Sequence, residues 1–175
     1  MAIHVEVNSR DVRKMAQAIE NLAGGKAHQA INRAAKRAAI AARVAATKRI
    51  RAIYTIKARD MKSRAKVQGI ADGAVIHIKG PMEPVTTYKA RRNRKGVFVA
   101  IKKGGGSTVP RSFEHGRRSM QREGKSRLPV RGLYGPSVPQ LFGNPIVAAA
   151  MEERGLEVFE ERLLHEYGRL LGGGA

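Results

Sequence analysis

The chain has 175 residues, with 34 lysine and arginine residues against 14 aspartate and glutamate residues, so its formal net charge is +20. It contains no cysteine, which excludes disulfide scaffolds, thiol catalysis, iron–sulfur clusters and cysteine-ligated zinc. We expect one domain over residues 1–175, and no apolar stretch approaches the roughly 20 residues of a membrane span. Residues 1–7 are too short and too polar for a signal peptide, so we expect folding in a reducing cytoplasm.

The positive charge is concentrated in the middle of the chain. Residues 1–25 hold 3 basic and 3 acidic residues, residues 26–131 hold 28 and 5, and residues 132–175 hold 3 and 6. A compact region with this much self-repulsion needs a polyanion, an acidic partner or acidic neighbours to offset it.

The first third of the chain is expected to be mainly helical, over residues 1–66. Residues 2–7 alternate apolar and polar side chains, which predicts a strand. Apolar residues from Val12 to Leu22 then recur on one face of a predicted helix over residues 8–24, and this helix ends at Gly24 and Gly25. A long second helix is predicted from Lys26 to Tyr54. A short basic helix is predicted over residues 57–66.

The long helix has a basic face and an alanine face. At 100° per residue its cations fall within an arc of roughly 140°. They are Arg33, Lys36, Arg37, Arg43, Lys48 and Arg51. The basic face is either simply exposed to solvent, or it is turned toward nucleic acid or an acidic neighbour.

Residues 72–132 are predicted to form a small antiparallel sheet. Residues 74–79 and 97–102 are rich in β-branched side chains, and residues 85–88 form a weaker strand between them. The segment 89–95 places five positive charges in seven residues, as a basic hairpin tip. Its candidate DNA-facing residues are Arg91, Arg92, Arg94 and Lys95.

The next segment is poor in apolar residues. Over residues 114–127 only Met120 is substantially apolar, so we expect a mobile loop in the isolated chain, able to become ordered on assembly. Prolines and glycines then predict an extended stretch over residues 128–139.

The chain is predicted to end in an amphipathic helix from Pro145 to about Leu171. Its apolar stripe is Val147, Met151, Phe159, Leu163, Tyr167 and Leu170, and its solvent side carries Glu152, Glu153, Glu157, Glu160, Glu161 and Glu166. The predicted fold class is therefore α+β: a small antiparallel sheet with a long basic alanine-rich helix, a short basic helix and an acidic C-terminal helix.

The sequence shows no pattern typical of catalysis or of a cofactor. None of the five histidines has a partner at a metal-binding spacing, and Gly124-Lys125-Ser126 lacks the earlier glycine of a phosphate-binding loop because position 119 is Ser119. We expect neither enzymatic activity nor a cofactor or metal.

Electrostatics and assembly remain as the expected functions. The basic helix face and the basic hairpin provide sequence-independent attraction to phosphates, whereas four Phe and four Tyr are few for base stacking. The cations could instead contact the acidic final helix of the next copy of the chain, in a head-to-tail interface. A freestanding basic protein that binds nucleic acid, architectural or ribosome-associated, is the alternative.

Several segments together resemble the minor tail protein Z family of tailed bacteriophages and prophages. They are Tyr88-Lys89-Ala90-Arg91-Arg92-Asn93-Arg94-Lys95-Gly96-Val97-Phe98-Val99, Lys102-Lys103-Gly104-Gly105, Val109-Pro110, Phe113, and the run from Arg127-Leu128-Pro129-Val130 through Tyr134-Gly135-Pro136-Ser137-Val138-Pro139-Gln140. The likeness covers most of the chain, and the last motif is its most specific part. Val85-Thr86-Thr87 stands where the family has a more apolar strand, and Phe113 is followed by Glu114-His115.

The resemblance implies a structural virion protein, assembled in the host cytoplasm and located in the tail or neck. It would complete the head-proximal end of the tail as a homo-oligomeric ring, six-fold like the tail tube. Its partners would be other tail and neck proteins, such as the tail terminator and the head–tail connector, with non-specific contact to phage DNA. No membrane is implied.

Two groups of residues are the candidate assembly interfaces. We expect Tyr134, Gly135, Pro136, Ser137, Val138 and Pro139 to form an extended arm that packs against a neighbour, the alternative being an ordinary loop that leads into the last helix. Glu153, Glu157, Glu160 and Glu161 are the acidic candidates.

Overall fold

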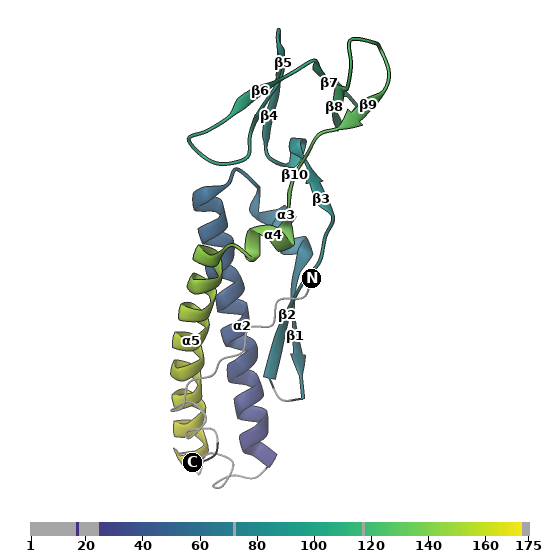
Figure 1. The fold of residues 1–175 in the computed structure, drawn as a ribbon. Coiled ribbons are helices and arrows are strands. Elements are labelled where there is room, and N and C mark those ends of the chain that lie inside the picture. Colours follow the sequence, from purple (N-terminus) through teal and green to yellow (C-terminus); the bar gives the residue numbers. More distant parts are fainter. Residues whose placement is uncertain (1–16, 18–24, 72, 117, 173–175) are drawn as a thin grey trace.

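The computed structural model describes residues 17, 25–71, 73–116 and 118–172, and over them the fold is α+β as predicted. Two long antiparallel helices lie side by side, with a β-hairpin along one of them and the remaining small sheets gathered near one end (Figure 1). The strand predicted over residues 2–7 and the helix predicted over 8–24 fall outside the described residues, apart from Gln17.

The two long helices confirm the prediction from sequence. Helix α2 (Gly25–Ile53) and helix α5 (Pro145–Gly172) pack along a seam that repeats about every fourth residue. The seam consists of Ala27, Ala34, Ala38, Ala42, Ala46 and Ile50 from α2 and of Val147, Met151, Gly155, Phe159 and Leu163 from α5, all buried. Small side chains on α2 let the two backbones approach closely, so the larger side chains of α5 supply most of the buried apolar area.

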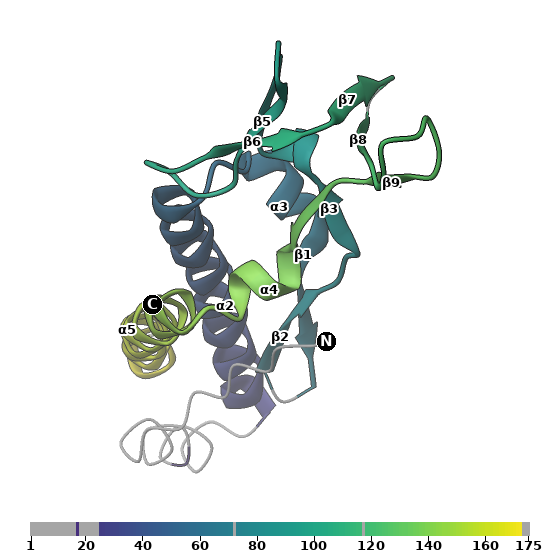
Figure 2. The ribbon, with the colours of Figure 1, turned by 45° about the horizontal axis from the view of Figure 1, so that its top comes forward.

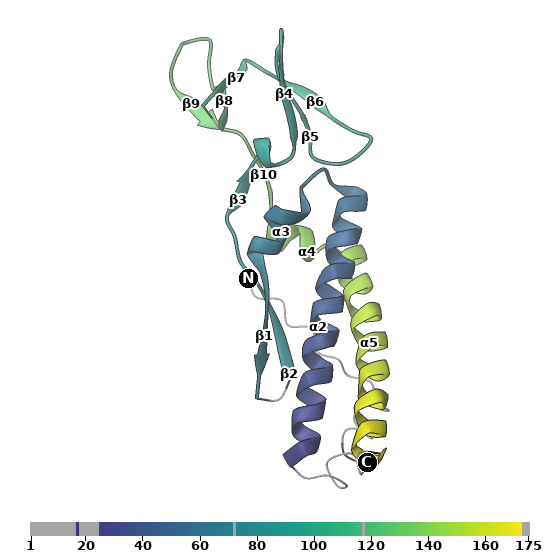
Figure 3. The ribbon, with the colours of Figure 1, turned by 180° about the vertical axis from the view of Figure 1, so that it is seen from behind.

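A short helix and a β-hairpin lie beside α2 (Figure 3). Helix α3 (Ala58–Arg64) leads into strands β1 (Ala65–Ile70) and β2 (Gly73–Ile78), which pair antiparallel. The Asn32 side chain donates a 2.6 Å hydrogen bond to the Ala71 carbonyl, and the Arg43 guanidinium donates a 3.3 Å bond to the Ala65 carbonyl. Polar groups on α2 thus fix both ends of β1.

The predicted single sheet is wrong. Strand β2 pairs with β1, whereas β5 (Gly96–Ala100) lies between β4 (Lys89–Asn93) and β6 (Ser107–Pro110) in a separate antiparallel sheet. Most of the predicted basic hairpin tip is therefore strand β4, followed by a turn at residues 94–95.

Residues 85–87 are a 3₁₀ turn, η1 (Val85–Thr87), and not the predicted strand. The Tyr88 amide donates to the Val85 carbonyl and closes this turn, while the Val85 amide donates to Leu133. The turn leads the chain from β3 (Met82–Pro84) toward the next strand and buries Val85 in an apolar cluster with Val97 and Val99. A straight strand would carry Val85 out of this apolar cluster.

The predicted loop over 114–127 contains strand structure. Strands β7 (Ser112–His115), β8 (Arg118–Arg122) and β9 (Val130–Gly132) form a three-stranded antiparallel sheet (Figure 2). The Arg122 guanidinium lies 5.4 Å from the centroid of the Phe113 ring and shields it. Because pairing uses backbone hydrogen bonds, strands form here with few apolar side chains.

The predicted arm packs within its own chain. Strand β10 (Tyr134–Ser137) pairs with β3, and Ser137 then caps helix α4 (Val138–Phe142) through a reciprocal bond with Gln140. Gly135, Ser137, Val138 and Pro139 are buried, and Tyr134 is half exposed. The Val138 side chain joins the core beside α2 and α5, whereas the Tyr134 ring stays exposed.

Candidate functional site

A groove of about 470 Å³ opens between α2 and α3, and three of the predicted DNA-facing residues, Arg43, Lys48 and Arg51, lie in its lining. Arg43, Val44, Thr47, Lys48, Arg51 and Ala52 of α2 line it, together with Ala58 and Lys62 of α3 and with Lys103 after β5. Five cations from three separate segments thus share one groove, which we call the basic groove.

Helical spacing and backbone hydrogen bonds place these cations. Arg43, Thr47 and Arg51 are four residues apart and so share one side of α2. The Thr47 hydroxyl donates a 2.9 Å bond to the Arg43 carbonyl and is thereby occupied by the helix itself. The Lys103 amide donates a 2.8 Å bond to the carbonyl of Ile53, which brings the end of β5 to the end of α2. In α3, Met61 is fully buried, and its neighbour Lys62 is exposed.

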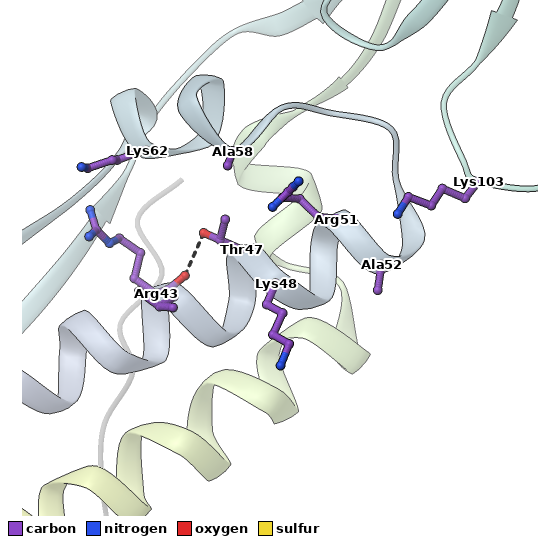
Figure 4. A pocket seen from close by; sticks show the side chains of 9 residues that line it. Arg43, Thr47, Lys48, Arg51, Ala52, Ala58, Lys62 and Lys103 are labelled. Atoms are coloured by element: carbon purple, nitrogen blue, oxygen red, sulfur yellow. Dashed lines mark hydrogen bonds between the residues drawn. The ribbon is translucent and has the colours of Figure 1, made fainter.

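The cations are spread along the groove (Figure 4). Arg43 and Lys62 lie at one end of the view, Arg51 lies farther along α2, and Lys103 points toward the end of α2 from the other side. Lys48 extends away from these four. The groove therefore presents cations along its length and is not a pocket closed around a single point.

Among the residues that the structure describes, the lining of the basic groove contains no acidic residue. Among the described residues none of its five cations has a carboxylate within ion-pair distance, whereas Arg64 pairs with Glu83 at 3.4 Å and Arg154 with Glu157 at 2.7 Å. Several unneutralised positive charges in one concave surface attract anions, and guanidinium and ammonium groups donate strong hydrogen bonds to phosphate oxygens. Its chemistry is that of a phosphate-binding surface.

A second hollow, between α3 and η1, differs in its charge. Its volume is about 250 Å³, and it is lined by Lys57, Arg59, Asp60, Ser63, Arg64, Glu83, Thr86 and Thr87. Glu83 is buried and pairs with Arg64, and Asp60 pairs with Arg59 at 3.4 Å. The two carboxylates neutralise part of the positive charge, so this hollow is a poorer site for anions.

Three of the six predicted cations on α2 lie in the basic groove: Arg43, Lys48 and Arg51. Lys36 and Arg37 are exposed outside it. The prediction that Arg33 is free to face DNA is wrong. Its guanidinium lies 2.7 Å from a Glu166 carboxylate oxygen on α5 within the same chain. That bond lowers the pKa of Glu166 and raises the pKa of Arg33. The prediction failed for Arg33 because the helix wheel carries no information about which helix lies opposite.

The predicted cations of β4 and its turn are placed apart from the groove lining. Arg91, Arg92, Arg94 and Lys95 are all exposed. The Arg91 guanidinium lies 5.4 Å from the centroid of the Phe98 ring, its cross-strand partner. This cation–π contact holds Arg91 over the sheet at small cost in solvation.

The acidic candidates on α5 differ in whether an ion pair within the chain neutralises them. Glu157 pairs with Arg154 at 2.7 Å, and Glu161 lies 3.8 Å from Arg162. Glu153 is exposed, Glu160 is half buried, and neither has an ion pair among the described residues.

Lys62 and Lys103 are the groove cations that were not predicted from the sequence. The sequence shows that they are basic, but no local spacing relates them to α2.

No protein-family model matches this chain, and comparisons with curated proteins and with solved structures give no significant match. The site is therefore interpreted from its own residues. In the described part of the chain no three His, Asp or Glu residues converge as metal ligands. No helix there is long and apolar enough to cross a bilayer.

Proposed function

We propose that this protein is a structural component of a bacteriophage tail or neck, which forms an oligomeric ring at the head-proximal end and directs its basic groove toward DNA. The observation that carries the DNA contact is the groove itself: five cations come from α2, α3 and the segment after β5, and no acid stands among the lining residues that the structure describes. Such a surface binds phosphates whatever the base sequence.

The distribution of charge favours assembly from several copies. The cations of α2 and the acids on the outer side of α5 belong to adjacent helices but to different surfaces, so one copy's acidic surface matches the next copy's basic one. A contact between two different surfaces of identical chains is heterologous, and it closes into a ring when the rotation allows. Glu153 and Glu160 are the two acidic candidates that have no ion pair among the described residues.

The tail assignment itself rests on the likeness of the Leu-Pro-Val and Tyr-Gly-Pro-Ser-Val-Pro motifs to the minor tail protein Z family. Within the fold the second motif joins β3, β10 and α4 and so serves the core. We therefore place the contact between copies on the helix surfaces and on exposed Tyr134, and not on an arm.

The alternative is a freestanding basic protein that binds nucleic acid as a monomer. Light scattering of the full chain at low and high salt, with and without duplex DNA, separates the two. An oligomer that forms without DNA supports the ring, and a monomer whose DNA affinity falls steeply with salt supports the alternative. Variant Glu153→Lys/Glu160→Lys should dissociate the oligomer, with Lys125→Glu as a control for a charge reversal elsewhere on the surface.

Detection of the chain in purified phage particles, by mass spectrometry and by density at the neck, tests its location. Absence of the chain from particles of a phage or prophage that encodes it would overturn the tail assignment.

A further inference from the structure

The basic groove opens at a junction where three elements are joined by hydrogen bonds. The Thr55 hydroxyl donates a 2.7 Å bond to the Ala100 carbonyl at the end of β5 and accepts a 3.0 Å bond from the Lys89 amide at the start of β4. Tyr54 bridges to Lys102 through backbone pairing. Lys89, Lys102 and Lys103, all exposed, are thereby brought to the end of α2 that carries Arg51.

Two long acid-free segments meet at this junction. Residues 25–59 contain ten lysine and arginine residues and no aspartate or glutamate, and residues 84–113 contain eight and none. The segments are distant in sequence, and the hydrogen bonds of Thr55 join them. Repulsion between these positive charges opposes folding, and a bound anion would reduce this repulsion.

Strand β4 extends the basic surface beyond the junction. Alternate residues of a strand face the same side, so Lys89 and Arg91 share one face of the sheet. Arg91 is held there over Phe98. The cations of this surface are thus Arg43, Lys48, Arg51, Lys62 and Lys103 in the groove, Lys102 and Lys89 at the junction, and Arg91 on β4.

We infer that the basic groove, the junction and β4 form one path for a continuous phosphodiester chain, and that the ligand is bound through several consecutive phosphates. This inference rests on the DNA contact proposed above. The helix rises by about 12 Å from Arg43 to Arg51. Phosphates recur every ~3.4 Å along the axis for each strand of a duplex, so the groove alone matches about three phosphate intervals.

The same residues disfavour recognition of bases. A nucleobase needs an open aromatic face for stacking. The Phe98 ring is covered on one side by Arg91, and Gly106 passes so close that a Cβ atom there would stand 2.5 Å from Phe98 Cζ. The aromatic ring of this sheet thus supports a cation and is not available to a base.

The test uses the full chain and fluorescent DNA duplexes of increasing length and two unrelated sequences, titrated at several salt concentrations. The junction variant is Lys89→Gln/Lys102→Gln, and the groove variant is Arg51→Gln/Lys62→Gln. The matched control is Lys125→Gln/Arg127→Gln, two exposed cations in the segment between β8 and β9. Circular dichroism verifies that each variant is folded.

We expect both the junction and the groove variants to weaken binding of long duplexes, with the slope of log affinity against log salt reduced by about 0.9 for each phosphate that the variant no longer binds. The control should leave the slope unchanged, and the two sequences should bind alike. Inorganic phosphate at concentrations far above that of DNA phosphate should fail to displace the duplex.

Three results overturn the inference. In the first, the junction variant binds long duplexes with the affinity and salt slope of the unaltered chain, while the groove variant binds them more weakly. The proposed DNA contact then stands, and only the continuous path is wrong. Another is displacement of the duplex by inorganic phosphate at equal phosphate concentration, which indicates a single-phosphate site. The third is absence of DNA binding by the unaltered chain, which removes the proposed DNA contact as well.

Discussion

The Tyr88 hydroxyl donates a 2.6 Å hydrogen bond to the carbonyl of Pro136, 48 residues later in the chain. This bond ties the residue before β4 to the strand that leads into α4. The start of the basic strand is therefore anchored to the core beneath it, and perturbation of Tyr88 should be felt in the stability of the fold.

Tyr88 should titrate above the ordinary range of a tyrosine. Burial, followed by the negative charge of Glu83 and the influence of Tyr54, raises the pKa of Tyr88 to about 12. Because the folded pKa lies above the ordinary value of about 10, the stabilisation is complete below that value and is lost as pH rises through about 12. Ultraviolet absorbance of tyrosinate should show a late component that belongs to Tyr88.

Replacement Tyr88→Phe should remove that late component and lower the free energy of unfolding by about 1 kcal/mol, the usual loss for one hydrogen bond. Tyr134→Phe, at a side chain that is half exposed, is the control and should change stability little. Persistence of the late component in Tyr88→Phe would assign it to another tyrosine.

Replacement Gly135→Ala should destabilise the fold by about 1–3 kcal/mol, because the Tyr88 ring leaves no room for a methyl group at position 135. A Cβ atom at Gly135 would stand 2.8 Å from Cε2 of Tyr88. Gly105→Ala is the matched control, since a Cβ atom there meets nothing within 4 Å. Urea unfolding measures both, and equal midpoints for the two variants would show that the Tyr88 ring moves aside.

Two glycines of α5 should respond differently to alanine. Gly168 has open space around it, so Gly168→Ala should raise the free energy of unfolding by about 0.5–1 kcal/mol through helix propensity alone. A Cβ atom at Gly155 would stand 3.4 Å from Cβ of Ala42, in the seam with α2. Gly155→Ala should therefore gain less than Gly168→Ala. A larger gain at Gly155 in thermal unfolding would mean that the seam has spare room.

The ion pair between Arg33 and Glu166 should make stability depend on acidic pH. Hydrogen bonding to Arg33, which outweighs the opposing effect of burial, and the charges of Arg33, Arg169 and His165 lower the pKa of Glu166. The pair's contribution is thus present above the ordinary glutamate value of about 4.3 and is lost as pH falls through the lower folded pKa.

Replacement Glu166→Gln should cost up to about 1 kcal/mol near neutral pH, a small value because the Arg33 side chain is 44% exposed and solvent screens the pair. The cost should vanish below the folded pKa of Glu166. Glu153→Gln, at an exposed acid without an ion pair among the described residues, is the control. A difference between Glu166→Gln and the unaltered chain that is constant with pH would show that the change in stability is not electrostatic.

Local pattern was sufficient for the parts of the fold that depend on neighbours in sequence. The period of apolar residues predicted α2, α3 and α5 nearly to their ends, and β-branched runs predicted β2 and β5. The concentration of cations on α2 and around β4 was equally visible, because charge is a property of each residue alone.

Pairing between distant segments could not be predicted in the same way. Residues 85–88 look like a strand, yet Val85 is held in a turn by the Leu133 carbonyl, 48 positions away. Residues 114–127 contain a single substantially apolar side chain, Met120, and still include β8, since the pairing of β8 with β7 and β9 uses backbone hydrogen bonds.

The sequence by itself determined the class of fold, the two long helices and the positive sign of the charge that gathers on α2 and β4. Only the tertiary structure decided which cations are free: it neutralised Arg33 with Glu166, and it brought Lys62 and Lys103 to Arg43 and Arg51. The physical reason is that helix and strand periods arise from bonds within a few residues, whereas electrostatic neutralisation depends on which segments lie within a few ångströms after folding.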